Sequence, residues 1–126
     1  MPFLARLAAF QLGLQVVHVL DHARQGRATP AALTFVGALG VVVWVAVFVL
    51  ARRRSPYTQP FTVLVGFATF SGFLAVHVLP HWSGAFSDPY AAAGVDAISW
   101  ITLALPALVA LWAGLAALPL RRTAVT

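Results

Sequence analysis

The segment AALTFVGALGVVVWVAVFVLA, residues 31–51, contains no charged side chain and a single hydroxyl group. A transmembrane helix needs about 20 consecutive, mostly apolar residues, so this segment predicts a helix that crosses a lipid bilayer. Three further apolar runs accompany it, at residues 3–22, 61–81 and 91–120. The sequence therefore predicts an all-α membrane protein, a four-transmembrane-helix bundle in which residues 1–126 form a single domain.

The composition also indicates that a bilayer surrounds the chain. Of the 126 residues, 61% are hydrophobic and only 9% are charged, whereas a soluble domain carries roughly a quarter charged residues. The net charge of +5 comes from eight arginines at the ends of the apolar runs, so we expect no nucleic-acid partner. Because the chain has no cysteine, disulfides, thiolate metal sites and iron–sulfur clusters are excluded.

The distribution of arginines predicts the orientation, because cytoplasmic loops retain positive charge. Six arginines fall on one side of the predicted membrane and two on the other; the six are Arg6, Arg52, Arg53, Arg54, Arg121 and Arg122. We therefore expect both termini in the cytoplasm, and no cleavable signal peptide, since no small-x-small site follows the first run. Arginine without lysine, together with abundant alanine and valine, indicates a GC-rich bacterial genome and hence a bacterial plasma membrane.

The fourth apolar run is longer than a bilayer requires. It contains Pro106, and proline is a common cause of helix kinks. We expect a tilt or a kink near Pro106 to absorb the excess length.

All four histidines lie at the predicted outer ends of two spans. The first span ends HVLDH at residues 18–22, and the third ends HVLPH at residues 77–81. Residues four apart share one face of a helix, and these two spans run in the same direction. If they are neighbours or lie diagonally across the bundle, the four imidazoles converge. Pro80 weakens the prediction for His81, because a proline disturbs the last turn of its helix and turns His81 outward.

The two histidine pairs belong to a longer internal match. A shift of 59 residues aligns Gly13 with Gly72, Val17 with Val76, and residues 18–20 with residues 77–79. The same shift places His22 on His81, which suggests two duplicated helical hairpins with a site between the repeats.

The carboxylates gather on the same side of the membrane as the histidines. The chain has three, Asp21, Asp88 and Asp96, and charged groups at membrane depth are costly and usually functional. Asp96 is expected about one turn into the fourth span, and Asp88 is expected to form a turn. Gln11 and Gln15 extend the polar face of the first span towards mid-membrane.

These residues predict a site for a transition metal ion. Neutral imidazole suits zinc, copper, iron and nickel, and carboxylates complete or orient the ligand shell. The predicted ligands are His18, His22, His77 and His81, with Asp21 or Asp96 assisting. The ion would serve a metal-dependent membrane enzyme or a metal-handling protein.

Two other functions remain open on the sequence alone. A haem- or quinone-binding redox subunit could use His18 and His77 as axial ligands, with Arg24 and Arg27 pairing with haem propionates. A structural subunit of a larger membrane complex, or a homo-oligomer, could use the histidines only for packing. A transporter is less well supported, because the second and fourth spans carry almost no polar residue below Thr102.

Overall fold

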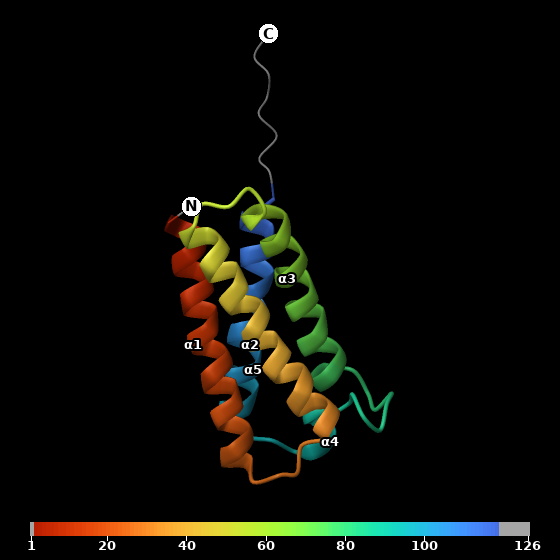
Figure 1. Cartoon of the computed structure of the whole chain (residues 1–126). Coiled ribbons are helices and arrows are strands. Elements are labelled where there is room, and N and C mark those ends of the chain that lie inside the picture. The colour runs from red at the N-terminus through yellow and green to blue at the C-terminus, as the bar shows by residue number, and fades with distance from the viewer. Residues whose placement is uncertain (1, 119–126) are drawn as a thin grey trace.

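A computed structural model describes residues 2–118, all of whose regular elements are helical (Figure 1). The elements are α1 (Pro2–Gln25), α2 (Ala31–Arg52), α3 (Thr58–Phe73), the π-helical turn η1 (Leu74–Val78), α4 (Tyr90–Ala93) and α5 (Ala97–Ala116). Four helices are long and apolar enough to cross a membrane, α3 and η1 counting as one. The all-α, four-helix transmembrane prediction is therefore confirmed. The predicted positions of Arg121, Arg122 and the end of the fourth run lie outside the described residues.

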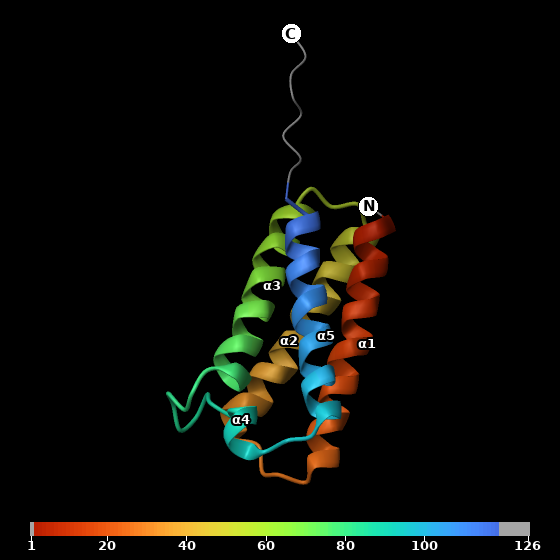
Figure 2. The ribbon, with the colours of Figure 1, turned by 180° about the vertical axis from the view of Figure 1, so that it is seen from behind.

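The four long helices alternate in direction, so that the N-terminus and the end of α5 lie at one end of the bundle (Figures 1 and 2). Helix α1 packs against α2 and α5, and α3 packs against α5 and, less extensively, against α2. Helices α1 and α3 therefore lie diagonally across the bundle and run in the same direction. This arrangement is one of the two that bring the histidine-bearing helix ends together.

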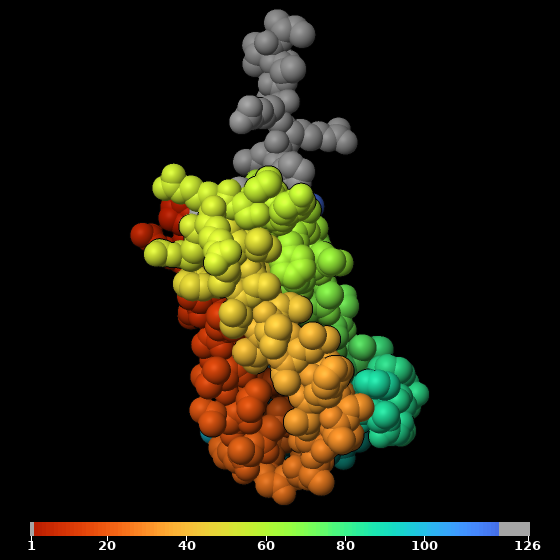
Figure 3. Space-filling model, in the orientation of Figure 1, coloured from red at the N-terminus to blue at the C-terminus, as the bar shows by residue number. Residues whose placement is uncertain are grey.

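The apolar core fills the half of the bundle nearest the termini. Its buried members come from all four long helices; they are Leu7, Ala8, Trp44, Val47, Val65, Ala110 and Ala113. Large apolar side chains also cover the outside, and α2 crosses the face seen in Figure 3 with Phe35 69% exposed. So much exposed apolar surface is unusual for a soluble monomer and is what lipid-facing helices present.

Helices α3 and α5 approach each other through glycine. A Cβ atom on Gly66 would lie 2.6 Å from the carbonyl oxygen of Ala110 and 2.6 Å from the backbone nitrogen of Gly114. Small residues allow such close backbone contact between membrane helices, so Gly66 fixes the spacing of this helix pair.

The fourth apolar run is interrupted, unlike the continuous span that the sequence predicts. Its first residues form the short helix α4, and Gly94 then adopts a left-handed backbone conformation with φ of 63°. Asp96 is the N-cap of α5, where its carboxylate accepts a hydrogen bond from the Ser99 backbone N–H. A turn before α5 therefore takes up the excess length, and Asp96 precedes the span instead of lying one turn inside it.

The third span ends at Val78, three residues before the predicted end. Leu79 is extended with ψ of 149°, as expected for a residue that precedes proline. The chain then folds back, and the Asp88 backbone N–H donates to the Val76 carbonyl. This return brings the loop before α4 against the end of η1.

Candidate metal centre

Three of the four histidines meet at the end of the bundle opposite the termini. His18 and His22 come from successive turns of α1, and His77 comes from η1 on the diagonal helix. Each offers a ring nitrogen, and these three nitrogens lie within 4.8 Å of one another. His18 and His77 are buried, at 6% and 5% exposure, and His22 is half-buried.

The spacing within the α1 pair is close to that of two ligands on one ion. The Nε2 atoms of His18 and His22 lie 3.2 Å apart. Two nitrogens that each lie 2.0–2.1 Å from a tetrahedral zinc ion are about 3.3–3.4 Å apart. The pair therefore needs little movement to chelate an ion.

The ring of His77 is oriented by the loop that precedes α4. Its Nδ1 atom lies 3.1 Å from the backbone carbonyl oxygen of Asp88. A carbonyl only accepts, so Nδ1 carries the proton and donates it, which leaves the lone pair of the neutral ring on Nε2. Metal-binding histidines are commonly oriented by such a bond from the other ring nitrogen.

His81 is not brought to this cluster. It follows Leu79 and Pro80 beyond the end of η1, in a non-helical and exposed segment. The His-x3-His spacing places two residues on one face only while the helix continues, and Pro80 ends the α-helical geometry that the spacing requires. Of the two aligned His-x3-His spacings, only the one in α1 therefore places both of its histidines in the cluster.

The two predicted assisting carboxylates are engaged by other side chains. The carboxylate of Asp21, which is buried, accepts hydrogen bonds from Arg24 Nε at 2.8 Å and from Gln25 Nε2 at 2.7 Å. Asp96 is paired with both terminal nitrogens of Arg24, at 2.9 and 2.7 Å. Neither aspartate belongs to the three-histidine group.

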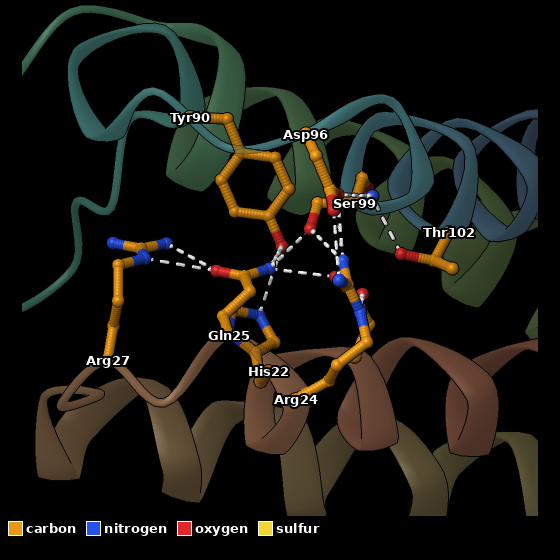
Figure 4. Close-up of polar contacts among 9 residues, drawn as sticks. His22, Arg24, Gln25, Arg27, Tyr90, Asp96, Ser99 and Thr102 are labelled. Carbon is orange, nitrogen blue, oxygen red and sulfur yellow. Dashed lines mark hydrogen bonds and ion pairs between the residues drawn. The ribbon is translucent and has the colours of Figure 1, made fainter.

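A polar network lies beside His22 and joins the end of α1 to Tyr90, Asp96 and Ser99 (Figure 4). Gln25 donates to the carboxylate of Asp21 and to the Ser99 hydroxyl, and its oxygen accepts from Arg27. The Tyr90 hydroxyl lies 3.4 Å from Gln25 Nε2 and 3.4 Å from His22 Nε2. The network therefore connects the site to α4 and to α5.

The sequence did not predict Gln25 or Tyr90 as part of this site, and it offered Arg24 and Arg27 only as haem partners. Arg27 instead pairs with Asp88, with contacts of 2.8 and 3.1 Å. Burial alone would raise the pKa of the Asp88 carboxyl, but the hydrogen bonds and charge of Arg27 lower it overall. Burial raises the pKa of Tyr90 to about 12, so its hydroxyl is protonated at neutral pH.

Aromatic rings enclose the histidines within the bundle. The ring centroids of His18 and Phe73 are 5.0 Å apart, and those of His77 and Tyr90 are 4.4 Å apart. Below His18, the buried Gln11 donates from Nε2 to the Pro106 carbonyl at 3.0 Å. The polar face of α1 therefore ends at Gln11, in the apolar core. Among residues 2–118, no series of polar side chains continues from Gln11 to the end of the bundle that holds the N-terminus.

These features define a class of protein: a four-helix transmembrane bundle with a three-histidine cluster near one membrane boundary. Comparison with protein-family models, curated proteins and solved structures finds no match. The functional argument therefore depends on the geometry of the cluster.

Proposed function

We propose that the protein binds one transition metal ion through His18, His22 and His77. The observation that carries this proposal is the convergence of three ring nitrogens within 4.8 Å from two diagonal helices. Burial supports it as well, because His18 and His77 are only 6% and 5% exposed, so the cluster is shielded within the bundle.

The ligand set favours zinc, copper, iron or nickel, all of which neutral imidazole binds well. Three protein nitrogens leave a fourth position of a tetrahedral ion open, which is typical of catalytic rather than structural zinc sites. The protonated Tyr90 hydroxyl, 3.4 Å from His22 Nε2, can donate a hydrogen bond to a water or other ligand in that position. Such a site supports a metal-dependent membrane enzyme or a protein that hands its ion to a partner.

The geometry favours an ion over a haem. The plane of a haem must pass between its two axial imidazoles. The His18 and His77 ring centroids are only 5.3 Å apart, and the His22 ring contacts both, with centroid distances of 4.7 and 5.3 Å. The three rings thus occupy the space that a macrocycle would need.

The orientation of the site follows from the arginines. In a bacterial plasma membrane, the end with Arg6 and residues 52–54 faces the cytoplasm, which places the histidines near the outer surface. The ion would then exchange with the outer compartment.

The decisive experiment is metal analysis of the full chain, purified in detergent without a histidine tag. The protein is stripped with a chelator, reloaded with Zn²⁺ or with Co²⁺ as a coloured probe, and measured by elemental analysis and absorption spectroscopy. We expect one ion per chain and the visible absorption of tetrahedral Co²⁺. A Soret band in the untreated protein would support a haem instead, and failure to bind any ion would leave only a structural role.

His81 supplies the matched control. His18→Ala, His22→Ala and His77→Ala should each lose the stoichiometric ion, whereas His81→Ala should retain it. Equal loss in His81→Ala would overturn the three-histidine assignment. Circular dichroism of each variant in detergent checks that the helices are intact.

A further inference from the structure

A cavity lies at the end of the bundle opposite the histidine cluster, between the start of α1 and the end of α2. It is an open cleft of about 440 Å³. Its lining residues are Pro2, Ala5, Arg6, Ala9, Phe48, Ala51, Arg52 and Arg54. None of them belongs to the histidine cluster, so this cleft is independent of the proposed metal site.

Three guanidinium groups line the cleft, from Arg6, Arg52 and Arg54. All three residues are exposed, and none forms an ion pair within residues 2–118. The three aspartates of the sequence all lie towards the other end of the bundle, and the sequence has no glutamate. The cleft therefore concentrates positive charge that no acidic side chain nearby neutralises.

Arg54 is held at the cleft by the way α2 ends. Its N–H donates to the Ala51 carbonyl, and the following Ser55 N–H donates to the Leu50 carbonyl. This is the Schellman pattern, which requires a left-handed residue that is usually glycine. Arg54 adopts that conformation with φ of 53°, at a cost of roughly 1–2 kcal/mol for a residue with a Cβ. The helix end thus fixes where the third guanidinium emerges.

The remaining walls of the cleft are apolar. Ala5 and Ala9 on α1 and Phe48 and Ala51 on α2 line it. Ala9 and Phe48 lie about one turn further from the helix ends than Arg6 and Arg52, towards the centre of the predicted membrane. A free phosphate ion would use the guanidinium groups but not these walls. A phospholipid would use both, with its phosphate at the arginines and its glycerol and upper acyl carbons against the apolar walls.

We propose that this cleft binds the phosphate headgroup of an anionic phospholipid. Guanidinium groups bind phosphate oxygens through paired, charge-assisted hydrogen bonds. Basic pockets between transmembrane helices are suited to anionic headgroups on the cytoplasmic side. The lipid would join the start of α1 to the end of α2 and stabilise that corner of the bundle.

The test is native mass spectrometry of the full chain in detergent, with phosphatidylglycerol or phosphatidylcholine added at equal concentrations. Phosphatidylglycerol should bind in preference to phosphatidylcholine. Arg52→Gln and Arg6→Gln should each weaken phosphatidylglycerol binding about fivefold, as expected for the loss of one cation worth about 1 kcal/mol near an anionic headgroup. Two variants are used so that a folding defect in one does not decide the result.

Arg53→Gln is the matched control, because Arg53 is adjacent and exposed but does not line the cleft. It removes the same charge from the same helix end and should leave phosphatidylglycerol binding unchanged. Equal weakening by Arg53→Gln would show diffuse attraction without a site and overturn the proposal. Equal binding of phosphatidylcholine, or displacement of the lipid by inorganic phosphate alone, would also overturn it, the latter by identifying a site for the free ion.

Discussion

The Nδ1 atom of His77 donates a hydrogen bond to the backbone carbonyl of Asp88, and the carboxylate of the same aspartate is held by Arg27. Asp88 therefore joins a buried ring on η1 to a cation in the loop after α1. Through its backbone it orients the ring, and through its side chain it is itself fixed. The precision of the three-histidine cluster thus depends on a residue that offers no ligand to it.

Arg27→Gln should weaken metal binding without abolishing it. Loss of the Arg27–Asp88 pair releases the loop that orients His77, and loss of such outer-shell support typically lowers metal affinity about 10–100-fold. Stoichiometry should remain at one ion per chain. The dissociation constant is measured by competition with a chelator of known affinity.

Asp96→Asn is the control for that measurement, because it weakens another ion pair at the same end of the bundle without touching a histidine. Its metal affinity should match that of the wild type. If Arg27→Gln also matched the wild type, the loop would not position His77.

Gly66→Ala should destabilise the bundle strongly. The added Cβ would lie 2.6 Å from backbone atoms of α5, and backbone cannot move aside as a flexible side chain can. Overpacking of this kind typically costs about 1–3 kcal/mol. The measurement is the free energy of unfolding from a denaturant titration in mixed micelles, followed by circular dichroism.

Gly72→Ala provides the comparison on the same helix. A Cβ at Gly72 meets no atom within 4 Å, so this variant should unfold at the wild-type denaturant concentration or above it. Similar destabilisation by both substitutions would mean that glycine flexibility, and not the α3–α5 contact, is what matters at these positions.

The four spans could be predicted because length and hydropathy are local properties of the chain. The shared face of His18 and His22 likewise follows from helical spacing alone. The sequence predicted that His77 meets this pair only on the condition that α1 and α3 are neighbours or lie diagonally across the bundle. Only the packing of all four helices decides between such arrangements.

His81 shows the limit of reading a site from repeated spacing. The shift of 59 residues that aligns His22 with His81 also aligns Asp21 with Pro80. Asp21 continues α1 and accepts hydrogen bonds, whereas Pro80 follows the end of η1. One residue between two identical spacings therefore decides whether both histidines or only the first one joins the cluster.

Asp96 could have been placed better from the sequence. Glycine at position 94 followed by aspartate just before an apolar run is a typical sign of a helix start, and the structure has Asp96 as the N-cap of α5. The contacts of Arg24 with Asp96 and of Gln25 with Tyr90 could not be found in this way. They join residues 72 and 65 positions apart, and no local pattern encodes them.

Thr69→Val should lower stability by about 1–3 kcal/mol, the usual cost of leaving a buried donor without a partner. Trp44 is fully buried, and its indole N–H donates to the Thr69 hydroxyl at 3.1 Å across the α2–α3 interface. Helices α2 and α3 are the least extensively packed of the neighbouring long helices, and this hydrogen bond links them directly. Thr69→Ser keeps the hydroxyl and should remain close to wild type in the same unfolding titration. If Thr69→Val also unfolded like the wild type, the hydrogen bond between Trp44 and Thr69 would contribute nothing to stability.

Acidification should weaken the link between α1 and α5. Hydrogen bonds from Arg24, reinforced by the Ser99 backbone N–H, lower the pKa of the Asp96 carboxyl from 3.8 to about 2. Because the pKa in the folded protein lies below that of the unfolded chain, the stabilisation is fully present above pH 3.8 and is lost as the pH falls towards 2. Asp96→Asn, which retains a good N-cap but no charge, removes this contribution at every pH. The thermal unfolding midpoint of the wild type should therefore exceed that of Asp96→Asn above pH 3.8, and the difference should shrink as the pH approaches 2. A difference that stays constant over this interval would mean that the carboxylate charge of Asp96 contributes nothing to the α1–α5 contact.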